Sequence, residues 1–496
     1  MNTSLNAGRR ARDIADLRKS TVDVLVVGGG VTGAGVALDA AARGLSVALV
    51  EAHDLANGTS RWSSKLVHGG LRYLAQGDVG LAYESAVERG IIMTTTAPHL
   101  TRTLPQLIPL HDSISRGRAA FTLAGLHAGD LLRRVARTPG ALLPKPRRIP
   151  TAEALALAPG LRKEGLRGGL LSYDGQLVDD ARFVIALART AAGLGARIIT
   201  RAKAINIDRT SAEVEDTETG TRFEIHANRV VNATGVWAGQ LVPSVRLRPS
   251  RGSHIVISGD GFTGTSLTVP VPGSSNRFVL VLPQLDGRVY VGLTDEPVDD
   301  IPAVPTAPES DVDFLLRTAS SVLERELTRD DVLGSYAGLR PLLEGEGASA
   351  DLSRKHAVLT APNGVLTIVG GKFTTYRRMA ADAVDATGLT TRPSTTRHLP
   401  LVGAGPVAVD APKRFVAKYG SEAALVAQGD LTEVHPGVTV AEVAWAVAHE
   451  GALCVEDVVE RRTRVGLVPA EGVRLSTVLA PLWPGFRSAR SSPSRS

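Results

Sequence analysis

The sequence predicts a mixed α/β chain in which a parallel-sheet domain comes first, a β-rich domain follows, and the C-terminal region is helical. Two short apolar runs, VDVLVV (22–27) and SVALV (46–50), are typical of buried parallel strands, and a small-residue helix is expected between them. Residues 250–300 are β-rich, and Leu285-Asp286-Gly287 indicates a hairpin turn between two antiparallel strands. Beyond Pro406 the apolar positions follow a helical period.

The parallel-sheet domain is predicted to be discontinuous, because two later segments repeat a strand that runs into a glycine turn. These segments are RVVNATGVWAG (229–239) and VLTIVGGKFTTYRRMAADAV (365–384). We assign residues 20–96, 165–245 and 335–395 to this domain, residues 97–164 and 246–334 to the β-rich domain, and residues 400–482 to a helical C-terminal cap. Within the cap, Thr439 and Glu442 fit a capping box. The polar ends, residues 1–19 and 487–496, are expected to be disordered.

The composition limits the partners that the chain can have. The net charge is +6, which favours an anionic partner such as nucleic acid, an acidic membrane surface or a phosphorylated substrate. Aromatic residues make up only 4%, so phosphate or membrane is favoured and no nucleic acid is expected. A single cysteine, Cys454, excludes an internal disulfide and a cysteine-rich metal site, and a reducing compartment, the cytoplasm, is expected. No apolar stretch is long enough to span a bilayer.

The first strand ends in a glycine motif that is typical of a Rossmann-type dinucleotide site. In Gly28-Gly29-Gly30-Val31-Thr32-Gly33, Gly28 allows a tight turn, Gly30 allows close approach of a pyrophosphate, and Gly33 allows close packing of helix on strand. The N-terminus of that helix, which includes Thr32, supplies amide donors. Glu51 ends the next strand, where it suits an adenosine ribose hydroxyl. By themselves these residues leave FAD and NAD about equally open.

A longer segment, TSRWSSKLVHGGLRYL (59–74), resembles the signature of FAD-dependent, quinone-linked glycerol-3-phosphate dehydrogenases. Further matches follow in the family's order between about residues 20 and 470: VDDARFVIALA (178–188), VNATGVWA (231–238), GSHIV (252–256), GLTD (292–295), SYAGLRPL (335–342), GGKFTTYR (370–377) and VEDVVERRTRVGL (455–467). The resemblance implies a fold of the D-amino-acid-oxidase-like group, with a Rossmann-type FAD domain, a β-rich substrate domain and a helical C-terminal domain.

The resemblance also implies a reaction. Members of this family oxidise sn-glycerol 3-phosphate to dihydroxyacetone phosphate by hydride transfer to FAD, and the electrons pass to a membrane quinone. Such proteins are often peripheral on the cytoplasmic face of the membrane, and the basic charge of this chain is compatible with that location. A homodimer is a further expectation.

Three residues are expected to carry the chemistry. His254 stands at the start of a predicted strand, and an ordinary imidazole pKa near 6.5 suits a general base, although a strand-end histidine can simply bond to backbone. Arg340 precedes Pro341 on an extended segment and can bind substrate oxygens by two hydrogen bonds, although a surface ion pair is the commoner fate of an arginine. Lys372 begins a helix, where a cation indicates an anionic neighbour, although it can also be a solvated side chain. The family match favours the catalytic role for all three.

The resemblance also assigns binding residues. It implies that Arg72 and Tyr73 bind the substrate phosphate, together with Arg354. The residues expected to contact FAD are Gly28, Gly30, Thr32, Gly33, Glu51, Ser63, Ser64, Lys65, His68, Gly69, Gly70, Leu71, Ala204, Ala233, Thr234, Gly235, Gly371, Lys372, Phe373 and Thr374. No metal site is expected, because the histidines form no HxxxH pair.

Two alternatives compete with this interpretation. One is an amino-acid or hydroxy-acid oxidase on the same fold, which would need a carboxylate-binding arginine and a more apolar pocket. The other is a flavin-containing nucleic-acid-binding or RNA-modification protein, which the basic charge permits. Such a protein should show a basic stripe with aromatics or a cysteine nucleophile. Neither pattern is found, and Cys454 lies in the predicted cap.

Overall fold

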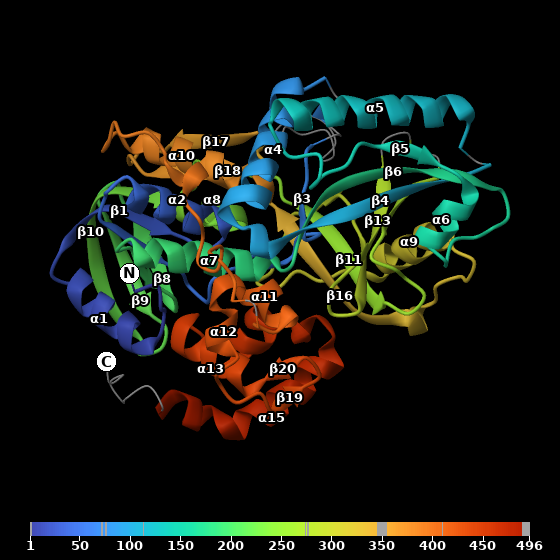
Figure 1. Cartoon of the computed structure of the whole chain (residues 1–496). Coiled ribbons are helices and arrows are strands. Elements are labelled where there is room, and N and C mark those ends of the chain that lie inside the picture. Colours follow the sequence, from blue (N-terminus) through green and yellow to red (C-terminus); the bar gives the residue numbers. More distant parts are fainter. Residues whose placement is uncertain are drawn as a thin grey trace.

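A computed structural model describes residues 2–70, 73–74, 77–112, 114–272, 274, 277–344, 355–408 and 410–488. In this part of the chain the helices are α1 (Ala7–Leu17), α2 (Val31–Ala42), α4 (Val79–Ile91), α5 (Arg116–Val135), α6 (Thr151–Leu157), α7 (Asp180–Gly193), α8 (Ala238–Leu241), α9 (Glu309–Ser320), α10 (Tyr376–Thr387), α11 (Lys413–Tyr419), α12 (Ala423–Val426), α13 (Val440–His449), α14 (Val455–Asp457) and α15 (Pro469–Ser488). Two large sheets and a helical C-terminal region share the molecule (Figure 1).

The first sheet forms the predicted discontinuous domain. Its described strands are β1 (Thr21–Val27), β2 (Val47–Val50), β7 (Arg197–Ile199), β8 (Ala202–Ile207), β9 (Ser211–Asp216), β10 (Thr221–Asn232), β17 (His356–Thr360) and β18 (Leu366–Gly370). They run in the order β17-β18-β10-β1-β2-β7, with β8 and β9 extending from β10, and β1 lies parallel to both of its neighbours. Helices α2, α7 and α10 pack on the face that includes Val24 and Val26. Helix α1 and the β8–β9 hairpin cover the face of Leu25 and Val27.

The second sheet is the predicted β-rich domain. It contains β3 (Leu66–Val67), β4 (Thr101–His111), β5 (Arg147–Ile149), β6 (Leu166–Leu177), β11 (Ser250–Ser258), β12 (Ser266–Pro270), β13 (Phe278–Pro283), β14 (Arg288–Gly292), β15 (Glu296–Pro297) and β16 (Val332–Arg340). Its described pairs are antiparallel except for β12 with β4. The predicted hairpin joins β13 to β14, where Gly287 takes a φ of +79° that suits glycine.

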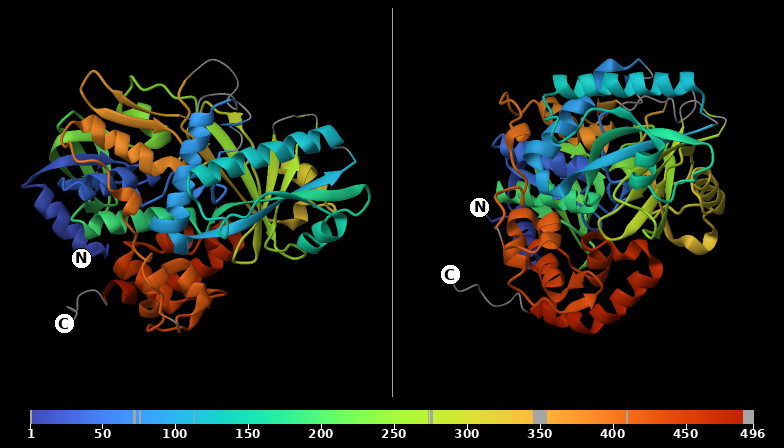
Figure 2. Two further views of the ribbon diagram at one scale, coloured as in Figure 1. Left: turned by 45° about the horizontal axis from the view of Figure 1, so that its top comes forward. Right: turned by 45° about the vertical axis from the view of Figure 1, so that its right-hand side comes forward.

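The C-terminal region is helical, as the sequence predicts, with one small hairpin of β19 (Glu433–His435) and β20 (Val438–Thr439). Thr439 caps α13, and Glu442 reaches back to the Thr439 backbone, so the capping box is confirmed. The region lies against the edges of both sheet domains (Figure 2). No helix in the described ranges combines the length and hydropathy needed to span a membrane.

The structure corrects two predictions about the ends of domains. The prediction of disorder over residues 1–19 is wrong, because α1 is a helix whose Leu17 side chain is 1% exposed and whose Arg10 pairs with Asp216. At the other end, α15 continues to Ser488, and the remaining residues of 487–496 lie outside the described residues.

The domain boundaries also move, since β3, β6 and β16 belong to the second sheet although they were expected in the FAD-binding segments. The sequence of a long apolar strand predicts the strand itself but not which of two sheets the strand joins.

Candidate active site

The turn after β1 has the backbone that its glycine motif predicts. Gly28 has a φ of +112°, and a Cβ at this position would lie 2.6 Å from the carbonyl oxygen of Ala233. A Cβ at Gly33 would overlap the carbonyl oxygen of Gly28. Helix α2 therefore packs directly against the turn, and only glycine fits at these two positions.

The N-terminus of α2 is prepared for an anion, and an acidic residue lies beside it. Gly30 is the N-cap in an extended conformation and supplies no side chain, while the Val31 amide donates to Ser60 Oγ at 2.9 Å. Glu51 ends β2 and accepts from the backbone amides of Gly29 (2.6 Å) and His53 (2.9 Å), and burial raises the pKa of this carboxyl. Sequence analysis missed Ser60, whose role depends on a contact 29 residues away.

A second turn follows β10 at the same edge of the sheet. The Ala233 amide donates to the carbonyl of Val27 (2.8 Å), and Asn232 Oδ1 accepts from the amide and hydroxyl of Thr234 at 3.2 and 2.7 Å. Gly235 has a φ of +62°. Since β1, β10 and β18 are parallel neighbours, their carboxyl ends bring together the three glycine turns that the sequence separates by hundreds of residues.

Ala204 lies on β8, next to the end of β2. The amide of Ala202, at the start of the same strand, donates to the carbonyl of Glu51 at 2.8 Å. Ala204 itself is 9% exposed and pairs with Val214 of β9. Its predicted backbone contact with the adenine stays a prediction, but the strand starts beside the acid that is expected to bind the ribose.

His254 is buried on β11, between β14 and β16 of the second sheet. On β11 it faces Gly292 of β14 and Tyr336 of β16, and a Cβ at Gly292 would overlap its imidazole. Nε2 lies 2.9 Å from Ser64 Oγ, and the ring stacks on Tyr336 with centroids 4.7 Å apart and an interplanar angle of 9°. Burial, helped by the cations of Lys65 and Arg340, lowers the pKa of His254 well below its ordinary value. The imidazole is therefore neutral at physiological pH.

Arg340 ends β16, and protein acceptors orient its guanidinium. Nη1 is 3.2 Å from Asp295 Oδ1 and 3.3 Å from Ser250 Oγ, while Nη2 donates to the carbonyl of Thr294 at 3.1 Å. A Cβ at Gly252 would overlap the guanidinium, so glycine at this position leaves the space that the arginine fills. The side chain is 19% exposed, so Arg340 forms a partly buried ion pair with Asp295, and its binding of substrate oxygens stays a prediction.

Lys372 lies beside Tyr73, as the assigned roles of both residues require. Its ammonium is 4.1 Å from the centroid of the Tyr73 ring and donates to Ser85 Oγ on α4. The neighbouring Thr374 Oγ1 accepts from the amide of His68 at 3.3 Å. His68 and Tyr73 therefore meet residues 372–374 at one place. No sequence pattern points to Ser85, which reaches the site only through the packing of α4.

Some predicted residues do not fit this picture or cannot be placed. Leu71, Arg72 and Arg354 lie outside the described residues, and their roles stay predictions. Lys65 is 2% exposed, and its ammonium pairs with Asp180 Oδ2 at 2.9 Å, so its side chain is directed into the protein. In the described part of the chain no cluster of His, Cys, Asp and Glu could hold a metal ion.

These features together fit a flavin adenine dinucleotide. The turn at Gly28–Gly33 packs so tightly that a Cβ at Gly28 or Gly33 would meet backbone atoms. This packing holds the backbone amides at the start of α2 at the edge of the sheet, and the Glu51 carboxylate is fixed beside them. Phe373 packs against Phe183 of α7, with ring centroids 5.4 Å apart, which fixes the turn at Gly371. Gly371 has a φ of +71°, and a Cβ there would meet Met379 and His356.

Comparisons with known proteins agree with this fit. A family model described as FAD dependent oxidoreductase matches residues 23–377, and one described as the C-terminal domain of alpha-glycerophosphate oxidase matches residues 366–480. The chain is 51% identical to "Glycerol-3-phosphate dehydrogenase 1" of Mycobacterium tuberculosis over 96% of its own length and 98% of the relative. It is 35% identical to "Aerobic glycerol-3-phosphate dehydrogenase" of Staphylococcus aureus over 81% of this chain and 74% of the relative.

Solved structures give the same result. The glycerol-3-phosphate dehydrogenase from Bacillus halodurans complexed with FAD superposes with a TM-score of 0.74 at 26% identity, over 97% of this chain and 92% of that chain. The L-alpha-glycerophosphate oxidase from Mycoplasma pneumoniae shares the fold with a TM-score of 0.60 at 20% identity, over 77% of this chain and 99% of that chain. The chain belongs to the FAD-dependent glycerol-3-phosphate dehydrogenase family.

Proposed function

We propose that this chain oxidises sn-glycerol 3-phosphate to dihydroxyacetone phosphate, with FAD as the hydride acceptor. The observation that carries the proposal is the buried His254 imidazole on β11, the strand whose Gly252 packs against the Arg340 guanidinium, in a chain whose relatives are glycerol-3-phosphate dehydrogenases. An imidazole whose pKa is held below neutral is ready to accept a proton at physiological pH.

The residues of the candidate active site have different proposed roles. His254 takes the proton of the hydroxyl on carbon 2, while Arg340 binds substrate oxygens with donors that Asp295 and Ser250 hold in position. FAD, held at the three glycine turns, would supply the acceptor for the hydride of carbon 2. Tyr73 and Lys372 lie together and supply a cation for the phosphate end, where Arg72 and Arg354 are the further predicted ligands.

Reduction of a dye by the purified yellow chain tests this function. We expect efficient turnover of glycerol 3-phosphate and a much lower kcat/KM for unphosphorylated glycerol, because the cations contribute only when a phosphate is present. Similar efficiency with both compounds would contradict the proposal. Hydrogen peroxide formation that outpaces dye reduction would instead favour the oxidase alternative.

A membrane quinone is the electron acceptor that we propose, and helix α5 offers a surface for membrane contact. Its outer face exposes Phe121 (76%), Leu131 (59%) and Val135 (55%), and the exposed charges of the helix, at Arg116 and Arg134, are basic. The acidic residue of α5, Asp130, is buried against Arg133. The helix runs along the outer edge of the molecule (Figures 1 and 2). An apolar stripe with basic neighbours fits an anionic lipid surface.

Vesicle sedimentation tests the contact. The chain should sediment with vesicles of anionic lipid, and Phe121→Ser with Leu131→Ser should reduce that binding while dye reduction is unchanged. Equal binding by the variant would exclude α5 as the surface that contacts the membrane.

Light scattering of the purified chain tests the predicted homodimer. The cytoplasmic location stays a prediction.

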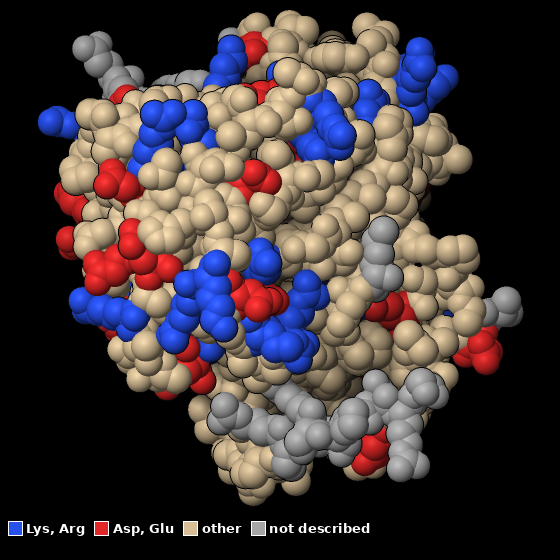
Figure 3. All heavy atoms as spheres, turned by 90° about the vertical axis from the view of Figure 1, so that its left-hand side faces the viewer, with Lys and Arg blue, Asp and Glu red and all other residues tan. Residues whose placement is uncertain are grey.

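The nucleic-acid alternative receives no support from the face that carries α1 and β10. There, Lys and Arg side chains lie among Asp and Glu side chains (Figure 3). Arg222 pairs with Glu213 and Glu215, and Arg10 pairs with Asp216. Basic groups that have acidic partners do not form the continuous positive stripe that a nucleic-acid surface needs.

A further inference from the structure

Lys65 is a buried cation just before β3, and the protein satisfies its charge. The ammonium donates to Asp180 Oδ2 (2.9 Å), to the carbonyl of Arg61 (3.0 Å) and to the carbonyl of Ser63 (3.1 Å). Since an ammonium has three donors, these contacts use its whole capacity. Burial lowers the pKa of Lys65 to about 8, and the Asp180 carboxylate opposes that fall. The side chain therefore serves the protein rather than the cofactor.

Asp180 orders the backbone on both sides of Ser64. Besides the Lys65 ammonium, Oδ2 accepts from the amide and the hydroxyl of Ser63, at 3.0 and 2.7 Å. Lys65 has a φ of +56°, a left-handed conformation that a residue with a Cβ adopts only when its surroundings hold it. Ser64 lies between the two anchored residues, and its Oγ is 2.9 Å from His254 Nε2.

A second set of contacts joins Lys65 to His254 through Tyr336. The Lys65 ammonium lies 4.9 Å from the centroid of the Tyr336 ring, and the same ring stacks on the His254 imidazole at 4.7 Å. The Tyr336 hydroxyl donates to the carbonyl of Ser63 at 3.2 Å. Ser64 therefore orients the imidazole at one ring nitrogen, and Tyr336 orients it at the face of the ring. Lys65 contacts Tyr336 directly and also contacts Ser63, the residue before Ser64.

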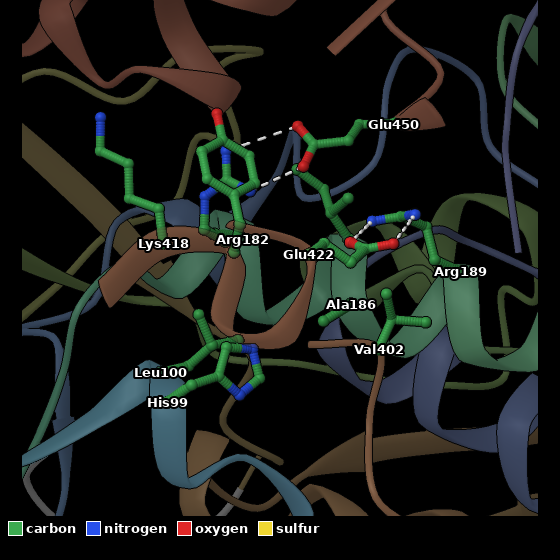
Figure 4. Close-up of a pocket in the computed structure, with 11 residues that line it drawn as sticks. His99, Leu100, Arg182, Ala186, Arg189, Val402, Lys418, Glu422 and Glu450 are labelled. Carbon is green, nitrogen blue, oxygen red and sulfur yellow. Dashed lines mark hydrogen bonds and ion pairs between the residues drawn. The ribbon is translucent and has the colours of Figure 1, made fainter. Parts of the chain in front are cut away.

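The C-terminal region fixes Asp180 from the other side. Arg464 Nε lies 3.3 Å from Asp179 Oδ2, and Arg464 Nη2 lies 3.9 Å from Asp180 Oδ1. Further along α7, Arg182 pairs with Glu450 and Arg189 pairs with Glu422 of the C-terminal region (Figure 4). These ion pairs hold α7, and with it Asp180, in a fixed place beneath the Ser63–Lys65 turn.

We propose that Lys65 and Asp180 are positioning residues that hold Ser64 and Tyr336 against His254, so that the imidazole is oriented for proton transfer from the substrate hydroxyl. The proposal rests on the proposed role of His254. The cations that face His254 are Lys65 and Arg340, and the charges that face Lys65 are Asp179, Asp180 and Arg464. Tyr290 and Tyr336 are the remaining titratable neighbours of Lys65.

The test is Lys65→Met in the full-length, FAD-loaded chain. Without the Lys65 cation the imidazolium form of His254 is less disfavoured, so the acid limb of the kcat profile should move up by about one pH unit. Its plateau kcat should fall by about tenfold, because the imidazole loses its fixed orientation. A histidine NMR titration should show the same upward shift for the His254 ring without any turnover. A variant that binds FAD and keeps both the wild-type acid limb and the wild-type titration would overturn the proposal.

A matched control separates positioning from general damage. Arg189→Met removes another buried ion pair of the same helix, so it should lower the melting temperature and leave the acid limb in place. An equal shift in this control would also overturn the proposal.

If Lys65→Met does not yield a folded, yellow protein, the variant Ser63→Ala tests the proposal instead. Because the Ser63 hydroxyl donates to Asp180, its removal should leave any backbone contact of Ser63 with FAD in place. We then expect kcat to fall by about fivefold with FAD content unchanged, and a wild-type kcat would contradict the proposal.

His254→Ala distinguishes failure of this inference from failure of the proposed function. Full activity of His254→Ala with glycerol 3-phosphate would remove the proposed role of His254, whereas a wild-type chain that holds FAD and does not oxidise glycerol 3-phosphate would remove the proposed function itself. Loss of activity in His254→Ala, together with an unmoved acid limb in Lys65→Met, would remove only the positioning role.

Discussion

The glycine turns and the His254 cluster are built in different ways. The turns consist of backbone at the carboxyl ends of β1, β10 and β18, and each follows its strand directly in sequence. The His254 cluster consists of side chains from β11, β16 and the Ser63–Lys65 segment, and it contains a buried ion pair. A site made of backbone requires small residues in its turns. A site made of side chains requires that tertiary folding brings residues from several segments into contact. The two regions should therefore respond to different substitutions.

The largest effect is expected in the backbone site. Gly33→Ala places a Cβ where the carbonyl oxygen of Gly28 lies, and neither backbone can move without breaking the packing of α2 on β1. We expect loss of bound FAD and a fall in unfolding free energy of about 3 kcal/mol or more. Absorbance of the purified protein and thermal unfolding measure both. A yellow, fully stable Gly33→Ala chain would break the distinction between the two regions.

The side-chain site should lose activity while it keeps the cofactor. His254→Ala removes the proposed base, and general base catalysis contributes about 100- to 10,000-fold to kcat. The FAD content should not change, because no glycine turn is touched. Since the neutral imidazole is the active form and its pKa is lowered, activity of the wild-type chain should fall with decreasing pH only below about pH 6.5. Loss of activity that begins above that pH would contradict a buried, neutral His254.

A smaller effect is expected at Gly292, which faces His254 across the sheet. Gly292→Ala forces the imidazole away from its place, because the added Cβ would overlap the ring. We expect kcat to fall by about tenfold and FAD to be retained. Steady-state kinetics beside an absorbance spectrum test this. Unchanged kcat would mean that the ring position is not required.

The smallest effect is expected at Ser60, the side-chain partner of the backbone site. Ser60→Ala leaves the buried amide of Val31 without its acceptor, which should lower the unfolding free energy by about 1 kcal/mol. FAD affinity should weaken severalfold, while kcat at saturating FAD stays unchanged. Fluorescence titration of the apoprotein with FAD measures the affinity. A large loss of kcat would show that the two regions are not separable.

The comparison also explains how far the sequence could be interpreted. The glycine motif, Glu51 and the hairpin at Gly287 follow from local chemistry, and all three were confirmed as structure. His254 and Arg340 depended on family resemblance, since neither residue type at that spacing implies a site. Ser60, Ser85 and Asp180 were missed because each reaches its partner only through tertiary packing. Helix α1 was missed because the polar composition of residues 1–19 indicates disorder, although Ile14 and Leu17 lie one helical turn apart on its buried face.

Anaerobic mixing of the yellow chain with sn-glycerol 3-phosphate tests the central claim most directly. Full and rapid bleaching of the flavin absorbance is expected, with dihydroxyacetone phosphate formed in equal amount. Glycerol at the same concentration should leave the spectrum nearly unchanged. A chain that stays yellow with glycerol 3-phosphate while it holds a full complement of FAD would contradict the account.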